Sequence, residues 1–351
     1  MKKLTKVLIL VIVAVMLFGA VPSSAAEPYD TYTYSIDGEP LKSPHAYSAI
    51  DNFDSLAMGL PALNPELPAL SSSVSDIVSD NVGNLYIADQ GNNRIIVLNK
   101  SYEAIAEISE YVNEFDEIQV LSEPQGVFVT DETKSVDGES LIYVCDTGNK
   151  RIVVFDRDYN YVRTIERPNS PILDEQAFKP SAVAVDIYGR IFVISKNSYE
   201  GVIVLSSEGA FTGFIGAQQV SYSLIDMIWR RFMSEEQRSM QEKNIAVPYN
   251  NITVDDDGFV YVTSSSNDPA DKKNQYSAIK AKSAAHSPVK KLNSQGIEIM
   301  KRNGFFDPGG EVAVTTTNVS QIVDVAMGTI IITTVAAAPA PERAIPPVTI
   351  C

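Results

Sequence analysis

One short pattern returns along this chain, and it limits the folds that the chain can adopt. Each copy has a short β-branched run, an Asp/Gly turn, a second run, a Gly/Asn turn and a third run. Turns of this composition between such runs predict antiparallel strands that follow one another as a meander. The copies, the last of them only begun, occupy residues 77–98, 124–155, 180–205, 248–263 and 322–326.

A single sheet of this kind is not stable alone. Four-stranded sheets, repeated at roughly 40 to 60 residues, bury both faces by stacking radially against their neighbours, which is the β-propeller solution. We therefore predict an all-β fold with one large domain over residues 27–328. Cys145 and Cys351 are the two cysteines, so an apolar core rather than a disulfide framework must hold this domain together.

The most specific part of the pattern is Asp-x-Gly-Asn-x-Arg-Ile, which occurs at 89–95 and again at 146–152. With the strand before it, this pattern resembles the NHL repeat, and the matching region covers about residues 74–263. The wider sequence, which includes residues 32–34 and 288–296, is similar to exported NHL-repeat proteins of Gram-positive bacteria. The resemblance implies a six-bladed ring, of which the visible copies supply four blades and the start of a fifth.

The first residues have the three parts of a secretory signal peptide: a basic start, an uncharged run from Val7 to Ala20, and small residues up to Ala26. We expect cleavage after Ala26; a retained membrane anchor is the alternative. Removing residues 1–26 takes away three lysines and leaves 25 basic and 44 acidic side chains, a net charge of −19. A surface of that sign repels phosphate backbones and anionic lipid, so we expect neither nucleic acid nor a membrane as the partner.

Two stretches interrupt the repeat. Residues 220–246 mix apolar and charged side chains at helical spacing, which predicts one or two helices that cap the channel, form a partner surface or cover blade edges. Residues 267–288 are rich in Lys, Ala, Ser and Asn and predict an exposed loop. After Gly328 the pattern stops. We expect that the reading frame is truncated or shifted there, which leaves the ring incomplete and residues 329–351 as an atypical tail.

Asp89 with Arg94 and Asp146 with Arg151 are the most specific polar pairs of the sequence. Two interpretations are open for them. The loop after the second strand of a blade emerges on the binding face of a propeller, which would place both pairs at a ligand mouth. In NHL repeats, to which the sequence is similar, such pairs more often brace their own turn. We favour the bracing role and keep the four residues as candidate binding residues.

The predicted helical insertion holds a second candidate contact. Trp229 is the single tryptophan of the chain, and Arg230 follows it directly. Aromatic residues with arginine make good interface anchors, so we expect Trp229 and Arg230 to contact a partner protein or a sugar. Packing of the helix against the propeller is the alternative.

Residues that carry chemistry are scarce. The two histidines, His45 and His286, fall in irregular segments far apart, and we assign no catalytic residue, metal ligand or cofactor. The run 255–258, Asp-Asp-Asp-Gly, resembles a fragment of a calcium loop but lacks the spaced ligands and the distal glutamate, so a β-turn explains it better. Cys145 is expected to be a small buried hydrophobe.

These observations favour an exported, non-catalytic binding or scaffold propeller at the bacterial cell envelope, with an envelope protein or a polysaccharide as its partner. The alternative is a divalent-metal-dependent hydrolase or lactonase of the six-bladed class. That activity would require several inward carboxylates at the channel mouth. The convergence of three Asp, Glu or Asn side chains on the axis therefore distinguishes the two functions.

Overall fold

The computed structural model describes residues 32–34, 40–42, 54–63, 69–170, 178–196, 200–216, 248–264 and 287–301, together with 173, 198, 273–274, 276–277 and 280–282. Two compact units divide the chain, Met1–Asn52 with Asp307–Ala313 and Phe53–Phe306 with Val314–Cys351. In the first unit, the described residues form an antiparallel pair of strands, β1 (Tyr32–Tyr34) and β2 (Pro40–Lys42). All elements discussed below belong to the second unit.

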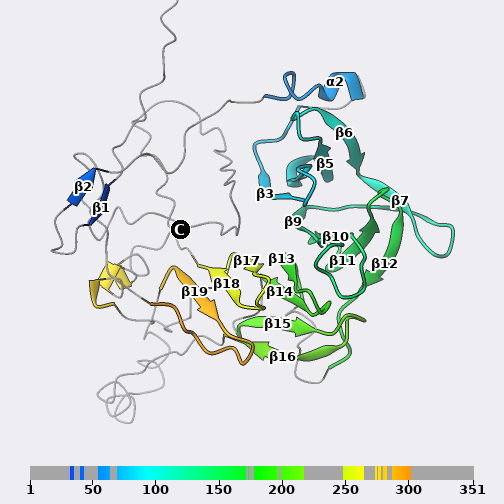
Figure 1. Cartoon of the computed structure of the whole chain (residues 1–351). Helices are drawn as coiled ribbons and strands as arrows, with labels where there is room; N and C mark the ends of the chain where they lie inside the picture. Colours follow the sequence, from blue (N-terminus) through cyan, green and yellow to red (C-terminus); the bar gives the residue numbers. More distant parts are fainter. Residues whose placement is uncertain are drawn as a thin grey trace, which may run out of the picture. The chain divides into compact units, whose positions relative to one another are not determined.

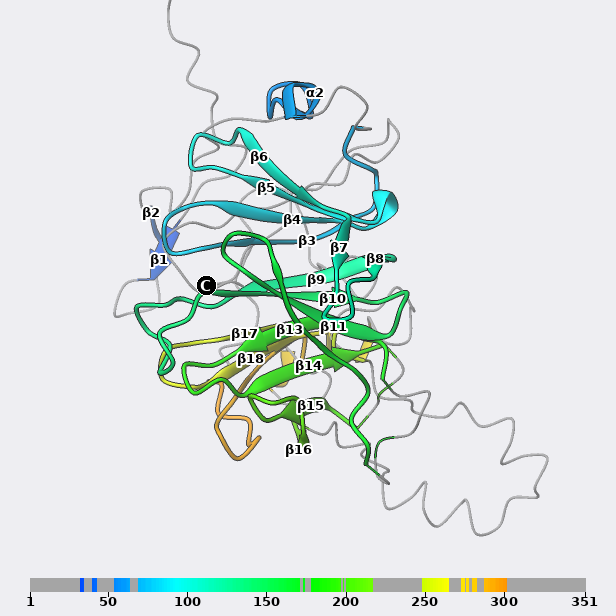
Figure 2. The same ribbon diagram turned by 90° about the vertical axis from the view of Figure 1, so that its right-hand side faces the viewer.

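Four antiparallel sheets of three or four strands make up most of the described part of the second unit, and each consists of strands that are consecutive in the chain (Figure 1). Figure 2 shows these sheets stacked on one another in sequence order. The first sheet contains β3 (Val74–Ser79), β4 (Leu85–Asp89), β5 (Arg94–Leu98) and β6 (Ala104–Ile108), and the second contains β9 (Pro124–Val129), β10 (Leu141–Asp146), β11 (Arg151–Asp156) and β12 (Tyr161–Ile165). The third contains β13 (Pro180–Val185), β14 (Ile191–Ser195), β15 (Val202–Leu205) and β16 (Phe211–Ile215), and the fourth contains β17 (Asn251–Val254), β18 (Val260–Thr263) and β19 (Val289–Leu292).

The first strands of successive sheets contact one another, β3 with β9, β9 with β13 and β13 with β17. Sheets that meet along their first strands and stack face to face are the blades of a β-propeller. The described residues therefore form four blades, and the predicted all-β propeller is confirmed to that extent. A bridge from Leu292 to Glu298 begins a fourth strand of the fourth blade. The predicted count of six blades is not tested by the described residues.

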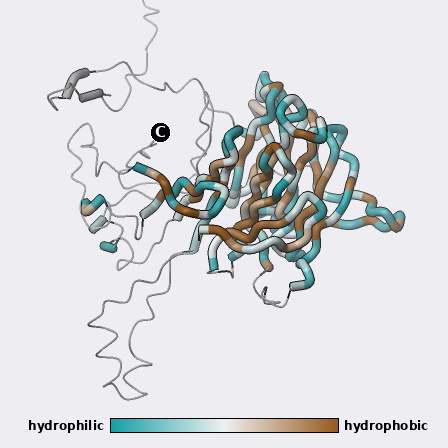
Figure 3. The backbone as a smooth tube through the Cα atoms, turned by 60° about the horizontal axis from the view of Figure 1, so that its bottom comes forward, coloured by the Kyte–Doolittle hydropathy of each residue, from teal (hydrophilic) through white to brown (hydrophobic). Residues whose placement is uncertain are grey.

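The central strands of the blades are buried on both faces. Every residue of β4, β5 and β10 is buried, whereas the outer strands β6 and β12 each have one buried residue. Unbroken runs of Val, Ile and Leu suit strands that have a neighbouring layer on each side. Figure 3 shows these hydrophobic stretches within the blades and hydrophilic residues at the turns. The buried thiol of Cys145 lies in the apolar cluster between the second and third blades, with Val183 and Val193.

A short segment covers the face of the first blade that is turned away from the second blade. Leu60 is the first residue of the four-residue helix α2 (Leu60–Leu63), and Met58 lies two residues before it. Both pack against Leu85 and Ile96 in one buried cluster. The backbone N–H of Ala104 donates to the carbonyl oxygen of Met58 at 2.7 Å, which joins the segment to the outer strand β6. An apolar blade face at this end of the stack is thereby protected from water.

The same pattern of side-chain hydrogen bonds stabilises turns in all four blades. The side-chain oxygen of Asp80 accepts the backbone N–H groups of Val82 and Asn84 at 3.0 and 2.8 Å. An Asp or Asn that bonds to the backbone ahead of it stabilises a turn between strands. The same bonds, to the second and fourth residues ahead, are made by Asn99, Asp156, Asp186, Asp255 and Asn293. The run 255–258 is therefore a β-turn, as we predicted.

Several predicted segments fall outside the described residues. They are the signal peptide at 1–26, the helical insertion at 220–246 and the tail at 329–351. Of the predicted loop at 267–288, residues 273–274, 276–277, 280–282 and 287–288 are described, and Lys273, Asn274, Tyr276, Ser277 and Lys280 among them are helical. No helix among the described residues is long and apolar enough to span a bilayer.

The contact between first strands supplies a test of the blade packing. A Cβ atom on Gly126, in β9, would lie 2.7 Å from the carbonyl oxygen of Ser181 and 2.8 Å from the Cα atom of Ala182, both in the backbone of β13. We expect Gly126→Ala to lower the free energy of unfolding by about 1–3 kcal/mol, because two backbones must move apart. Urea unfolding measures this difference. Ser79→Ala, at an exposed position of β3, is the control and should change little.

Candidate functional site

The two ends of the propeller carry different groups of side chains. In an antiparallel blade, the turns after the first and third strands lie at one end, and the turns after the second and fourth strands lie at the other. The two predicted Asp/Arg pairs follow the second strands β4 and β10. A hollow lies at the opposite end, where the first strands β9, β13 and β17 finish.

Asp89 and Arg94 hold the start of the first blade in place. The Nε atom of Arg94 donates to Oδ2 of Asp89 at 2.9 Å, and both side chains are buried, 1% and 0% exposed. The other carboxylate oxygen accepts the backbone N–H of Ser71 at 3.0 Å, and Asn92 donates to Oδ2 at 2.8 Å from the one-turn helix η1 (Gln90–Asn92). The pair thus fixes both its own turn and the segment that leads into β3.

Asp146 and Arg151 repeat this arrangement in the second blade. Arg151 Nε donates to Oδ2 of Asp146 at 2.8 Å, and the backbone N–H of Ser122 donates to Oδ1 at 2.7 Å. The guanidinium of Arg151 is less buried than that of Arg94, with 14% of its side chain exposed, and it lies over the ring of Tyr111. In both blades the pair therefore ties the turn after the second strand to the segment that precedes the first strand.

The third blade shows what the aspartate contributes. Ser195 stands at the position of Asp89 and Asp146, and its hydroxyl accepts the backbone N–H of Lys179 at 2.6 Å. The bond to the segment before the first strand is kept, although the carboxylate and its arginine are absent. These hydrogen bonds brace the turns in the way that we expected, and a ligand contact by Asp89, Arg94, Asp146 or Arg151 stays a prediction. Trp229 and Arg230 lie outside the described residues.

The hollow at the other end is an open space of about 440 Å³, counted with the solvent at its open side. The ends of three first strands supply its apolar floor, namely Phe128, Val185 and Val254. Its polar rim comes from the turns that follow these strands and consists of Thr130, Asp131, Lys134, Ser135, Asp186, Asp255 and Asp256. Three blades therefore contribute to one concave surface.

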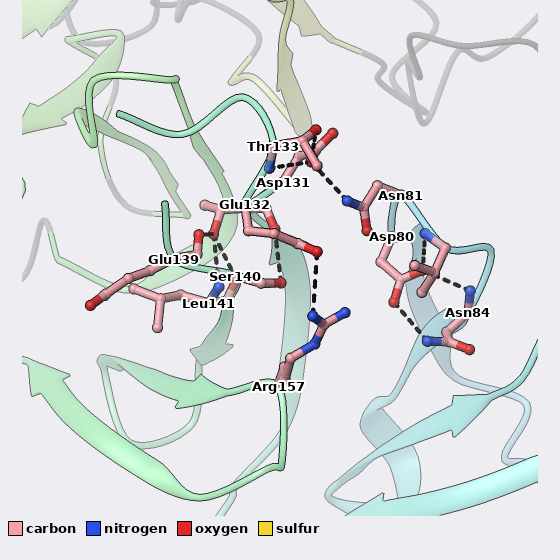
Figure 4. Close-up of polar contacts among 12 residues, drawn as sticks. Asp80, Asn81, Asn84, Asp131, Glu132, Thr133, Glu139, Ser140, Leu141 and Arg157 are labelled. Carbon is pink, nitrogen blue, oxygen red and sulfur yellow. Dashed lines mark hydrogen bonds and ion pairs between the residues drawn. The ribbon is translucent and has the colours of Figure 1, made fainter. Parts of the chain in front are cut away.

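A long turn of the second blade, residues 131–140, ties this end together. Figure 4 shows Asn81 of the first blade next to Asp131, and its amide Nδ2 donates to Oδ1 at 2.8 Å. The backbone N–H of Val136 donates to the carbonyl oxygen of Ile187 in the third blade at 2.9 Å. Lys134 forms an ion pair of 2.8 Å with Asp256 of the fourth blade. One turn thus bonds to three other blades.

The charges at the rim are of both signs. Burial acts to raise the pKa of Asp131, but hydrogen bonds from Thr133 and Asn81 outweigh it and lower the pKa. The hydrogen bond to Asp256 raises the pKa of Lys134. At neutral pH, the 131–140 turn therefore presents a carboxylate and an ammonium group within a few residues. The 131–140 turn is longer than the corresponding turns of the other copies. This difference in length is visible in the sequence and could have pointed to the hollow, but we did not predict a site from it.

The carboxylates of the rim do not gather as metal ligands. Among the residues that the structure describes, no three His, Cys, Asp or Glu side chains lie close enough together to hold a metal ion. In Asp186 and in Asp255, one carboxylate oxygen instead accepts hydrogen bonds from backbone N–H groups of its own turn. The other oxygen accepts from the side chain of Arg190 in the case of Asp186, and from that of Tyr261 in the case of Asp255. What the rim can do is accept and donate hydrogen bonds to a polar ligand.

Comparisons with known proteins found similarity to one family model and to solved structures. A family model described as a β-propeller repeat, SBBP, matches residues 248–269, which include β17 and β18. No curated protein matches the chain. Two solved structures of virginiamycin B lyase from Staphylococcus aureus, one of them a catalytically inactive form with quinupristin, are similar at 10% and 11% identity, each with a TM-score of 0.35.

These two alignments cover 78% and 79% of this chain and 63% and 64% of the lyase chains. A protein of unknown function from Bacteroides caccae is similar at 11% identity with a TM-score of 0.34, over 66% of this chain and 60% of that one. This chain therefore spans less than two thirds of the length of these structures.

The two Asp/Arg pairs differ in burial, which predicts a graded loss of stability. Asp89→Ala leaves the charge of Arg94 buried without its main partner, and we expect a loss of about 3–5 kcal/mol in the free energy of unfolding. Asp146→Ala should cost less, because Arg151 can reach solvent. Chemical unfolding of both variants measures the order. Equal losses would contradict the view that burial of the arginine decides the cost.

Proposed function

We propose that this chain is an exported, non-catalytic binding propeller whose partner at the cell envelope is a glycan or a protein. The observation that carries the proposal is the hollow at the ends of β9, β13 and β17, because three blades build it and one turn fixes its rim. Binding sites in proteins are concave, with an apolar lining and a few polar groups that orient the ligand. The apolar floor and charged rim of the hollow fit that description.

The chemistry of the rim favours a ligand rich in hydroxyl groups. Ionised carboxylates accept hydrogen bonds, and a lysine ammonium donates them, so Asp131, Lys134 and Asp256 together suit the hydroxyls of a sugar. The hydroxyl of Ser135 donates to Asp137, and its oxygen can accept a further hydrogen bond from a sugar. A segment of an envelope glycan is thus the ligand that we place in the hollow.

The finer parts of the proposal come from the sequence. We propose that the blades are NHL repeats of a six-bladed ring of the Gram-positive bacterial type, and that a signal peptide over residues 1–26 directs export to the envelope. The net charge of −16 supports a partner other than nucleic acid or an anionic membrane surface. Trp229 and Arg230 are proposed as further contacts to the partner. No observation among the described residues favours the divalent-metal hydrolase.

Calorimetric titration of the full chain with soluble cell-wall oligosaccharides tests the proposal. We expect binding that Lys134→Gln with Asp256→Asn weakens about tenfold, because two charged hydrogen-bonding groups at the rim are lost. Asp158→Asn, in an exposed turn that does not line the hollow, is the matched control and should bind like the unaltered chain. The glycan proposal fails if a natively folded chain binds none of the oligosaccharides, or if the double variant binds them equally well.

A further inference from the structure

A two-stranded hairpin stands between the first and second blades and belongs to neither sheet. It consists of β7 (Glu110–Val112) and β8 (Ile118–Val120), which pair in antiparallel register. Glu110 lies opposite Val120, and Val112 lies opposite Ile118. Because opposite residues share a face of the ribbon and alternate along it, these four side chains form one face and Tyr111 with Gln119 form the other.

The Tyr111 face anchors the hairpin to the second blade. Tyr111 is buried, stacks on Tyr161 with ring centroids 5.2 Å apart and meets the ring of Phe155 edge-on at 5.3 Å. The hydroxyl of Tyr161 donates a hydrogen bond to Glu114 in the hairpin turn. Arg151 donates to the carbonyl oxygen of Val120 at 3.4 Å. The hairpin is therefore held in a fixed position rather than left as a free loop.

The other face presents apolar side chains to solvent. The exposed fractions of Val112, Ile118 and Val120 are 53%, 70% and 58%, and Phe115 in the turn is 72% exposed. Single exposed hydrophobic residues are ordinary, but a group of four on one anchored ribbon marks an interaction surface. The two cores of the neighbouring blades do not use these side chains.

The backbone of β7 offers hydrogen bonds beside this apolar face. Asn113 donates to Glu117 and Leu121 donates to Ser109, so residues 111 and 119 also form a hydrogen-bonded pair by the alternation of the ladder. The N–H and C=O groups of Glu110 and Val112 then point away from β8. Within the described part of the chain, no strand pairs with β7 on that side. An extended segment could therefore add to the hairpin as a third strand.

The charge of the hairpin selects the occupant. Residues 110–120 contain Glu110, Glu114, Asp116 and Glu117 and no basic residue. A second copy of this chain would bring two such acidic sets together, and anionic lipid would be repelled in the same way. A segment that alternates aliphatic residues with lysine or arginine would pair with both the apolar face and the carboxylates.

We infer that the β7–β8 hairpin is a docking site for an extended, basic segment of a partner protein, which adds as a strand along β7. The inference goes beyond the glycan site, since the hairpin shares no residue with the hollow. Either surface can fail its own test without affecting the other.

A fluorescein-labelled peptide of alternating valine and lysine, titrated against the full chain by fluorescence anisotropy, tests the inference. We expect saturable binding that weakens with added salt, because the attraction between exposed charges is screened. Val112→Thr with Ile118→Thr should weaken binding about tenfold, since two apolar contacts are lost while the strand-forming tendency is kept. Glu110→Gln with Asp116→Asn should weaken binding and reduce its salt dependence.

Matched controls separate this site from general attraction to an acidic protein. Ile105→Thr with Val162→Thr alters two exposed aliphatic residues of the outer strands β6 and β12 and should leave the affinity unchanged. A peptide whose alternate backbone nitrogens are methylated should not bind, because it cannot pair with β7. Equal binding of a valine and glutamate peptide, unchanged binding by Val112→Thr with Ile118→Thr, or self-association through the hairpin in sedimentation would each overturn the inference.

Discussion

Burial on both faces of the central strands is the constraint on which the rest of this structure depends. A strand such as β5 is apolar on the side that faces the second blade and on the side that faces Met58 and Leu60. Such a sheet cannot turn either face to water without a large cost in exposed apolar area. Each blade is therefore stable only between two covering layers, and the repeat of the sequence follows from this need.

Acidic side chains fix the conformation of many of the turns that join the strands of each blade. Asp80, Asp186 and Asp255 set the turns after the first strands, whereas Asp89 and Asp146 set the turns after the second strands and hold the entry to their own blades. These carboxylates add negative charge to the chain and, through their hydrogen bonds to backbone N–H groups, also hold the turns in one conformation. Part of the negative charge of the chain is thus structural, and only the remainder is available for recognition.

The blades and their Asp/Arg turns could be predicted from the sequence because their signals are local: strand runs, turn residues and a five-residue spacing from Asp89 to Arg94. The contacts of the 131–140 turn could not be predicted, since Asn81, Ile187 and Asp256 are brought next to it only when the four blades stack. The β7–β8 hairpin was also missed. Residues 110–120 lie between two copies of the repeat. Their four acidic residues and the polar turn interrupt the apolar run by which a strand is usually predicted, and the apolar residues of the two strands face solvent instead of the core.

The place of Cys145 gives the stack an internal reporter. Its thiol lies in the interface of the second and third blades with no exposed area, and burial raises its pKa, so it is unreactive while the blades are in contact. Among the described residues it is the one cysteine. A thiol reagent can reach it only when these two blades separate. If closing is faster than the reaction, the rate of alkylation equals the equilibrium fraction of opened molecules multiplied by the alkylation rate of the freed thiol. The cohesion of one blade interface can in this way be followed in the native protein, independently of global unfolding.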